Sequence, residues 1–507
     1  MLLVRIGKAN RHKPMMNDSK KSESPIRAMK STNKTVMTAA ESTEQRGDTQ
    51  GNVSSTTTRR TQRRESVSSG LARVRKLAKE QPKLRFTALM HHLTIELLRQ
   101  SYFRLKRNAA PGVDGVTWEA YGAEHLDERI ADLHARVHRG AYRALPSRRK
   151  MIPKPDGRER PLGIASLEDK IVQRAMVEIL NEIYETDFLG FSYGFRPAKG
   201  QHDALDALAY AIVQTPVNWI LDADLRAYFD TVNHDWLIRF LEYRIGDSRI
   251  IRLIRKWLQA GVMEGLNVVA TTKGTPQGSV ISPLLANVYL HYCFDLWIVR
   301  WRKQSAHGKV VVVRYADDIV VGLQHHDDAT RLMSELEKRL ATFSLTLHPE
   351  KTRLIEFGRW AQDRRRRSGK GKPEPFAFLG FLHICSTSRN GHFQLRRQTR
   401  SDRMRVTLHA VRDQLRKRMH ESVEEQGRWL QSVVRGYFAY HAVPTNGPAL
   451  CSFRYRVTLL WRHVLSRRSQ NAYTTWRTMS AIVKTWLPLP RITHPWPQER
   501  FAVNHPV

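Results

Sequence analysis

The sequence predicts an α+β protein with a helical C-terminal unit. Runs rich in β-branched and aromatic residues predict strands at 218–224, 310–315, 318–322 and 376–382. Helical patterns lie between these runs without the strict alternation that marks a doubly wound sheet. After about residue 400 the pattern is helical again, with one apolar side formed by Leu408, Val411, Leu415 and Met419.

Two helices are predicted upstream of the strands. Residues 167–186 have the clearest pattern, with Ser166 as N-cap and an apolar stripe formed by Ile171, Ala175, Ile179 and Ile183. A second helix is predicted over 86–107, where Leu89, Leu93, Leu97 and Leu98 share one side. A basic loop, RRRRSGKGK at 364–372, interrupts the strand region.

The first 75 residues differ in composition from the rest. They are rich in Ser, Thr, Lys, Arg and Gln, and the first aromatic residue of the chain is Phe86. Such a segment buries too little surface to offset its ordering entropy. We therefore expect a disordered, flexible basic arm over 1–75, ending in a short helix near 71–79. A mitochondrial presequence is the alternative, which the acidic residues Glu41, Glu44 and Asp48 weaken.

Charge and cysteine content narrow the function classes. The 507 residues include 84 Lys and Arg against 48 Asp and Glu, a formal net charge of +36. A dense polyanion is the natural partner of such a surface, because binding releases condensed counterions. A basic protein that is merely soluble, or a ribosomal-type structural protein, is the alternative. No run of 18 apolar residues predicts a membrane span, and the three distant cysteines (Cys293, Cys385, Cys451) predict neither a disulfide framework nor a zinc ribbon.

Paired carboxylates stand out against this basic background. VVVRYADDIVVGL (311–323) predicts a hairpin with Asp317 and Asp318 at or beside its turn, and the strand over 218–224 places Asp222 and Asp224 on one face. Each segment alone also fits a plain turn or a solvated sheet face. Together they predict an acidic notch where hard divalent cations would bind. Two such ions can clamp both oxygens of an in-line phosphoryl displacement.

Seven motifs lie in order along the chain: IPKPDGRERPLGI (152–164), GFRPAKGQHDAL (194–205), LDADLRAYFD (221–230), GTPQGSVISPLLANVYL (274–290), YADD (315–318), LTLHPEKT (345–352) and FLGF (378–381). Their kind and order resemble those of the reverse transcriptase family. Further segments resemble group II intron-encoded proteins and their maturase domain: KRNAAPGVDGVTW (106–118), RWLQSVVRGYFAYHAVP (428–444) and FRYRVTLLWRHVLSRRSQ (453–470).

The resemblance implies a right-hand polymerase: fingers and a palm with an antiparallel sheet, then an α-helical thumb or maturase domain. The expected division is an arm over 1–75, fingers and palm over 76–395, thumb over 396–485 and a short tail over 486–507. The family carries an H-N-H nuclease with paired zinc cysteines in many members. No cysteine follows Cys451, so we expect no endonuclease domain and no zinc.

The resemblance also implies roles for individual residues. Asp224, Asp317 and Asp318 are the expected catalytic ligands of two Mg²⁺ ions. Asp222 shares a face with Asp224 and is the neighbouring acid that is hardest to exclude as a further metal ligand. Lys154, Arg160 and Gln277 are expected to contact the dNTP, with Gly274 and Gly278 allowing close backbone approach. Tyr228 is expected to exclude a 2′-hydroxyl, ordinary core packing being the alternative.

Arg412, Arg416 and Tyr437 are expected to bind RNA on a thumb surface with exposed aromatics (Trp429, Tyr437, Tyr440). Lys351 is expected to support the active site.

The implied function is an RNA-directed DNA polymerase of a group II intron that is also a maturase promoting splicing and mobility. Its expected partners are intron RNA, an RNA template with a DNA primer, and dNTPs, with no membrane. One alternative is a splicing cofactor that only binds RNA. Another is a related reverse transcriptase recruited to a CRISPR-linked or diversity-generating system. The expected location is the bacterial cytoplasm. The polymerase hypothesis requires Asp224 to lie near the tip that carries Asp317 and Asp318.

Overall fold

A four-stranded antiparallel sheet in the order β6-β7-β3-β8 forms the palm and carries the acidic segments. In this computed structural model, residues 58–153, 159–264, 267–269, 273–275, 277–468 and 474–504 are described. The palm strands are β3 (Trp219–Asp224), β6 (Val310–Tyr315), β7 (Asp318–Leu323) and β8 (Arg353–Glu356). Three of the four predicted strands are thus confirmed almost to the residue.

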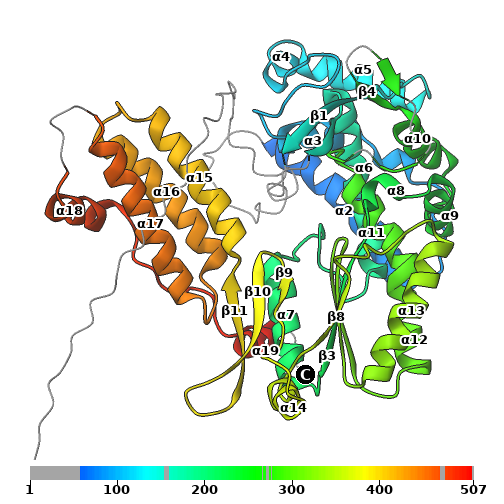
Figure 1. Ribbon diagram of the computed structural model, residues 1–507. Coiled ribbons are helices and arrows are strands. Elements are labelled where there is room, and N and C mark those ends of the chain that lie inside the picture. The colour runs from blue at the N-terminus through cyan, green and yellow to red at the C-terminus, as the bar shows by residue number, and fades with distance from the viewer. Residues whose placement is uncertain are drawn as a thin grey trace, which may run out of the picture.

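Both faces of the palm sheet are buried, because successive side chains of a strand point to opposite faces. Leu221 and Val321 enter one apolar core, while Ile220 and Val320 enter another. The first core is covered by helices that lie on the right in Figure 1. They are α8 (Tyr228–Thr231), α9 (His234–Arg244), α10 (Ser248–Gln259), α11 (Ser282–Leu290), α12 (Leu296–Gln304) and α13 (His326–Thr342). A π-helical segment, η2 (His291–Asp295), joins α11 to α12.

The fingers combine a second sheet, in the order β2-β1-β4-β5, with helices at the top of Figure 1. Its strands are β1 (Ser147–Pro153), β2 (Glu159–Ile164), β4 (Val262–Glu264) and β5 (Asn267–Val269). The helices are α3 (Ile95–Arg104), α4 (Trp118–Gly122), α5 (Leu126–His138) and α6 (Leu167–Asp187). Helix α6 confirms the prediction for 167–186: the Ser166 side chain accepts a hydrogen bond from the Asp169 amide, and the predicted stripe is fully buried.

The prediction of one helix over 86–107 is wrong in its first half. Residues 90–92 form a 3-10 turn, η1 (Met90–His92), and α3 begins only at Ile95, capped by the Thr94 side chain. The Asp247 carboxylate accepts hydrogen bonds from the Leu89 and Met90 amides at 3.0 and 2.9 Å. This tertiary partner holds the backbone in a non-helical path.

The short helix predicted near 71–79 is confirmed and is longer than expected, because helix α2 spans Thr58–Glu80. The flexible arm therefore does not extend to residue 75. Val74 and Ala78 are buried, and α2 packs on α6. The buried Arg244 guanidinium donates to the carbonyls of Ala78, Gln81, Pro82 and Leu84. The end of α2 is therefore part of the folded body. Residues 1–57 lie outside the described part of the chain.

The strand predicted over 376–382 is two strands with a tight turn between them. The second core lies under α7 (Gln201–Gln214) and a three-stranded sheet in the order β11-β10-β9. These strands are β9 (Phe376–Phe378), β10 (Phe381–Thr387) and β11 (Phe393–Thr399). Leu379 and Gly380 both have positive φ, 45° and 79°, so the chain reverses within FLGF.

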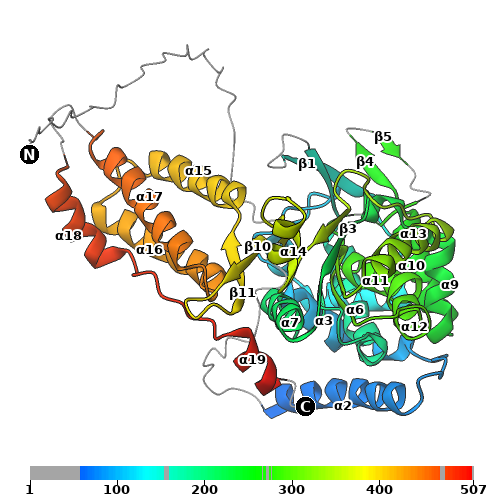
Figure 2. The same ribbon diagram turned by 60° about the horizontal axis from the view of Figure 1, so that its bottom comes forward.

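The thumb is a helical unit with its own apolar core, and it stands to one side of the palm in Figures 1 and 2. Its helices are α15 (Ser401–Lys417), α16 (Val423–His441), α17 (Gly447–Leu465) and α18 (Trp476–Trp486). The predicted boundary at 396 falls inside β11, and the helical unit begins at Ser401. The tail folds back: α19 (Pro497–Asn504) packs on α7, where Arg500 pairs with Asp203 and Asp206.

No helix within the described residues has the length and apolar character needed to cross a bilayer.

Three histidines lie where the palm meets the thumb, and they predict acid-sensitive folding. His383 is fully buried, and His202 and His441 are half-buried. Burial is the first cause that lowers the pKa of His202 and His383 to about 3 and that of His441 to about 4. The surrounding cations (Arg397, Arg403, Arg500) and His494 lower these values further. Below pH of about 6.5 the unfolded chain binds protons that the folded chain does not.

The contribution of these neutral histidines to folding stability is therefore fully present above pH of about 6.5, and it is lost as the pH falls. Each histidine removes about 2 kcal/mol at pH 5. We expect the melting temperature to fall between pH 7 and pH 5, and His383→Phe to reduce that fall. The Phe376 ring, stacked 4.8 Å from His383, leaves an aromatic environment for the new ring. An unchanged pH profile in His383→Phe would contradict this assignment.

Candidate active site

The end of β3 and the β6–β7 hairpin bring the predicted carboxylates together. Asp224 is the direct cross-strand partner of Asp318. The Cα atoms of opposite residues in an antiparallel pair lie about 4.5 to 5.5 Å apart. Ala316 has a positive φ of 55° and turns the hairpin, which places Asp317 at its tip. The condition that Asp224 lies near this tip is met.

The carboxylates of this tip repel one another. Burial is the first cause that raises the pKa of Asp318, to about 8, followed by the charges of Asp317, Asp224 and Asp222. Burial also raises the pKa of Asp317, with Asp224 adding to the effect and Arg160 and Arg314 opposing it. Asp318 nevertheless keeps an exposed surface. The exposed part of Asp318 lets an ion reach its carboxylate. The protein packed around the rest of the residue raises its pKa.

Two basic residues distinguish Asp224 from Asp222. The Lys351 amine lies 2.8 Å from the Asp224 carboxylate, and Arg353 lies 3.6 Å from that of Asp222. Lys351 is placed by the LTLHPEKT segment, which runs beside the end of β3: the His348 amide donates to the Asp224 carbonyl at 2.8 Å. Asp222 lies two residues before Asp224 on β3, opposite Val320, and so further from the tip. The geometry therefore groups Asp224 with Asp317 and Asp318.

The donor chemistry of this tip fits a hard divalent cation. It offers carboxylate oxygens alone, and their raised pKa values show negative charge without enough compensation. Within the described residues, no group of three His, Cys, Asp or Glu side chains forms a ready-made metal cluster. The Asp224 carboxylate faces Lys351 instead. Such an arrangement is compatible with Mg²⁺, which typically takes one or two protein carboxylates together with substrate phosphates.

A buried ionic network holds the hairpin tip from behind, and the sequence analysis missed it. Arg314, which is fully buried, donates to the Asp295 carboxylate at 2.8 and 2.6 Å and to Asn287 Oδ1 at 2.9 Å. It also donates to the Ala316 carbonyl at 3.0 Å. Asp295 comes from the π-helical segment η2. The only available signal was an arginine inside an otherwise apolar strand, VVVRY.

Two glycines of the recognised motifs are needed for close backbone packing. A Cβ on Gly194, in GFRPAKGQ, would lie 2.3 Å from the Ala316 amide nitrogen, so only glycine fits against the hairpin tip. Gly278 has a φ of 107°, and a Cβ there would lie 2.8 Å from the Gly163 carbonyl oxygen. Gly278 therefore lets the loop before α11 pack against β2. Close approach of its backbone to the substrate stays a prediction.

Tyr228 lies in the core beside this site. Its side chain is 2% exposed, and its hydroxyl donates to the Ala286 carbonyl at 2.6 Å. Burial raises its pKa well above the usual value. Tyr228 is therefore packed in the core, as the alternative expected. Its exclusion of a 2′-hydroxyl from the substrate stays a prediction.

Of the residues expected to contact the dNTP, Arg160 and Gln277 are described, and Lys154 lies outside the described residues. Arg160 is on β2, close enough to the acidic tip for its charge to lower the pKa of Asp317. The Gln277 carbonyl accepts a hydrogen bond from the Gly163 amide at 2.6 Å. The fingers hairpin and the loop before α11 therefore meet at one place.

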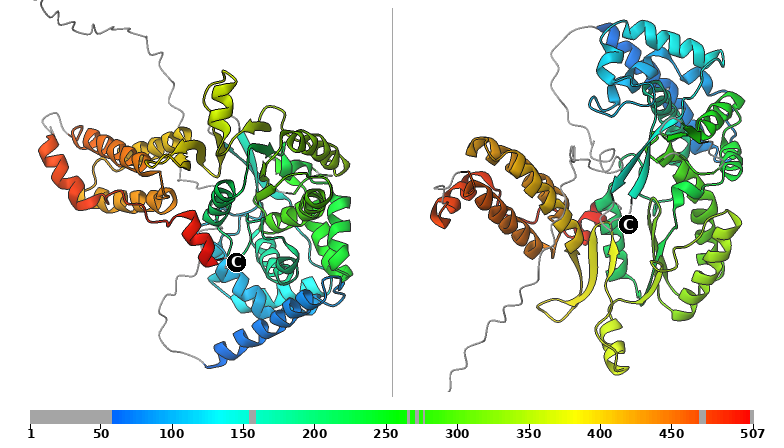
Figure 3. Two further views of the ribbon diagram at one scale, coloured as in Figure 1. Left: turned by 90° about the horizontal axis from the view of Figure 1, so that it is seen from below. Right: turned by 45° about the horizontal axis from the view of Figure 1, so that its top comes forward.

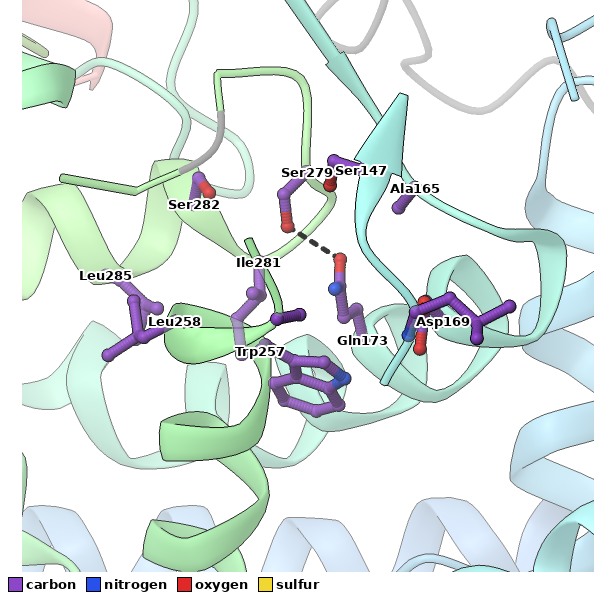
Figure 4. Close-up of a pocket in the computed structure, with 12 residues that line it drawn as sticks. Ser147, Ala165, Asp169, Gln173, Trp257, Leu258, Ser279, Ile281, Ser282 and Leu285 are labelled. Atoms are coloured by element: carbon purple, nitrogen blue, oxygen red, sulfur yellow. Dashed lines mark hydrogen bonds between the residues drawn. The ribbon is translucent and has the colours of Figure 1, made fainter. Parts of the chain in front are cut away.

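Gln173 supports that loop from below (Figure 4). Its side-chain oxygen accepts hydrogen bonds from the Ser279 hydroxyl at 2.7 Å and the Val280 amide at 3.1 Å. Gln173 is a buried polar residue on α6, and it lines a small cavity with Trp257 and Ile281. Its position on the helix gave no sequence signal, because it lies beside the apolar stripe.

Gln173→Leu should misplace the loop without unfolding the protein. The change leaves two donors without an acceptor, which costs about 1–3 kcal/mol. We expect KM for dNTP to rise about tenfold with a smaller change in kcat. Gln173→Glu keeps an acceptor oxygen and should restore much of the loss. An equal fall in the kcat of both variants with KM unchanged would contradict this role.

Of the three thumb residues expected to bind RNA, two reach the surface and one is buried. Arg416 is exposed and Arg412 partly exposed on α15. Tyr437 is buried, stacked on Phe453 at 3.5 Å and on His441 at 4.1 Å. It packs in the thumb core and presents no ring to RNA. Trp429 and Tyr440 are half-buried, and the Tyr440 hydroxyl donates to the Leu379 carbonyl at 2.9 Å.

Comparison with known proteins agrees with this geometry. Residues 152–383 match the family model described as reverse transcriptase (RNA-dependent DNA polymerase). The matched range covers β2, the palm sheet and the carboxylate tip. Protein YkfC of Escherichia coli is 34% identical over 320 residues, which cover 56% of this chain and 78% of that protein. The group II intron-encoded protein LtrA of Lactococcus lactis is 29% identical over 309 residues, covering 58% of this chain and 50% of LtrA.

The chain belongs to the reverse transcriptases and is similar to group II intron-encoded proteins. An uncharacterised 91 kDa protein in the cob intron of Schizosaccharomyces pombe is also similar, with 26% identity over 70% of this chain and 50% of that protein. The chain thus spans about half the length of LtrA and of the yeast protein. The predicted polymerase fold and enzyme class are confirmed.

Proposed function

We propose that this chain copies RNA into DNA at the carboxylate tip and also binds intron RNA to promote its splicing and mobility. The observation that supports the first activity is the pairing of Asp224 with Asp318 at the open end of the palm sheet. The chain around this acidic site carries a formal net charge of +36. A cationic protein attracts template and primer, and the acidic tip attracts cations.

The proposed cofactor is Mg²⁺, as two ions held by Asp224, Asp317 and Asp318. When bound, the ions would lower the charge repulsion between the primer 3′-oxygen and the triphosphate and stabilise the departing pyrophosphate. The family match supports the use of divalent ions, and the oxygen-only donor set favours Mg²⁺.

The chain's own residues contribute position and charge. Arg160, whose charge reaches Asp317, is placed to bind triphosphate oxygens with a planar guanidinium. Lys351 forms a 2.8 Å ion pair with the Asp224 carboxylate. Gln173 and Gly278 fix the loop that carries Gln277. The Arg314 network fixes the backbone of Ala316 and with it the direction of Asp317.

The maturase activity is supported by the relatives and by the thumb. Nuclear intron maturase 3 of Arabidopsis thaliana is 30% identical over 129 residues, 25% of this chain. The exposed cationic side of α15 is suited to RNA phosphates. A chain that only binds RNA remains the competing function. The proposed location is the bacterial cytoplasm, with which the free cysteines Cys293, Cys385 and Cys451 are compatible.

Primer extension tests the proposal. Purified protein, Mg²⁺, an RNA template with a DNA primer and dNTPs should yield DNA, and chelation of the metal should stop synthesis. A splicing assay on the flanking intron runs in parallel. Splicing without extension would favour the RNA-binding alternative.

Charge reversal on the thumb separates the two activities. Arg412→Glu with Arg416→Glu should weaken intron RNA binding at least about tenfold. The slope of log affinity against log salt concentration, here called the salt slope, should become shallower by about two. Splicing should fall with binding. The matched control, Arg302→Glu with Lys303→Glu at the end of α12, changes the same charge on a distant helix. Unimpaired splicing in the thumb variant would exclude this side of α15 as the RNA surface.

A further inference from the structure

We propose that residues 359–372, here named the α14 segment, form a second RNA-binding site at the back of the palm. The segment contains α14 (Ala361–Arg367) and the turn that follows it. It carries seven Lys and Arg side chains and one carboxylate, Asp363. This site goes beyond the polymerase tip and the thumb surface, and it depends on neither.

Two of the arginines anchor the segment to the palm. Arg364 donates to Glu356 at 2.9 Å and to Asn218 Oδ1 at 2.8 Å. Arg365 lies 3.7 Å from the Glu356 carboxylate and also donates to the Gly371 carbonyl at 2.8 Å, which ties the turn to the helix. Ala361 is fully buried beneath them. The segment is therefore built into the fold, although most of its residues are charged.

The other cations face solvent. Arg359, Arg366, Arg367, Lys370 and Lys372 are all exposed. Arg366 has only the exposed Asp363 at 3.7 Å, and no carboxylate of the described residues pairs with Arg367, Lys370 or Lys372. Several unpaired cations held in place by two anchored neighbours form a surface for polyphosphate.

The α14 segment lies far from the carboxylate tip. Its anchors, Asn218 and Glu356, adjoin Trp219 at the start of β3, whereas Asp224 ends that strand. Five residues of extended strand span about 16 Å. Figure 1 and the right view of Figure 3 show α14 at the palm edge opposite the fingers. A nucleic acid on this surface is thus separate from a primer–template at the tip.

An exposed aromatic ring favours RNA over duplex DNA as the occupant. Trp360 is 44% exposed, and the Arg359 guanidinium lies 5.7 Å from its ring centroid. A planar ring beside a guanidinium stacks well on an unpaired base. Structured RNA presents such bases in loops and bulges, next to the phosphates that the cations bind. A DNA duplex offers the phosphates without a free base.

The test uses the full chain with its polymerase site already filled. Protein is first bound to an RNA template and a dideoxy-terminated DNA primer with the next dNTP. A labelled hairpin RNA with an unpaired loop is then titrated. The variant replaces Arg366, Arg367, Lys370 and Lys372 with Gln. The control replaces Arg300, Arg302, Lys303 and Lys338 with Gln, removing the same charge from the exposed surface of α12 and α13.

We expect the variant to bind the hairpin at least about tenfold more weakly, with a salt slope reduced by about three to four. Trp360→Ala should weaken hairpin binding but not binding of a blunt RNA duplex. Primer extension should be unchanged in both, which separates this site from the proposed function. Equal losses in variant and control would overturn the proposal. So would hairpin binding that is unchanged in the variant, or a loss confined to a DNA duplex.

Discussion

Asp317→Asn and Asp318→Asn should each lower the rate of DNA synthesis by at least about a thousandfold. Metal ions contribute several kcal/mol to the stabilisation of phosphoryl transfer, and about 4 kcal/mol corresponds to a thousandfold in rate. Each variant removes one charged ligand while keeping the side chain's size. Single-nucleotide extension in Mg²⁺ measures the effect.

The same variants should be more stable than the parent chain in the absence of metal. Burial first, and then repulsion from the neighbouring carboxylates, raises the pKa of Asp317 and Asp318. An uncharged amide at either position avoids both costs. We expect a higher melting temperature in chelator, which also shows that the loss of activity is not a loss of fold. The control, Asp327→Asn on the exposed side of α13, should change neither property. Normal extension by Asp317→Asn or Asp318→Asn would contradict the assignment.

Arg314→Leu should destabilise the chain by about 3–5 kcal/mol, because it leaves Asp295 charged and buried without its partner. Both side chains are fully buried. The Ala316 carbonyl also loses its donor, so the hairpin tip is no longer held. Chemical denaturation measures the stability, and extension measures the activity.

A double variant separates these two consequences. Arg314→Met with Asp295→Leu removes the charged pair together and should recover much of the lost stability. It should not recover extension, since no side chain then donates to Ala316. If the stable double variant polymerises like the parent chain, the network does not position the tip.

Local sequence patterns were sufficient to predict the strands and the helix that carry the candidate site. The alternation of apolar residues with Asp222 and Asp224 predicted both acids on one face. The two Val-rich runs around Asp317 and Asp318 predicted a hairpin, which β6 and β7 form. These features depend on neighbours in sequence. For the same reason the α6 stripe and its Ser166 cap were predicted correctly.

Features that depend on distant partners were missed. The Arg314 network needs Asp295 from a π-helical segment that no simple period predicts. The interrupted helix before Ile95 needs Asp247, more than 150 residues away. Tyr437 is different, because a signal existed: it follows Leu430 and Val434 by seven and three residues. That spacing puts it on the apolar side of α16, and all three residues are buried.

Metal binding measured without turnover tests the central claim most directly. The protein is assembled with RNA template, a dideoxy-terminated primer and the matching dNTP, and bound Mn²⁺ is counted by electron paramagnetic resonance. We predict two ions per chain in the parent protein, and loss of at least one when Asp224, Asp317 or Asp318 is replaced by Asn. The same number of bound ions in the parent and in all three variants would contradict the claim that these carboxylates hold the catalytic metals.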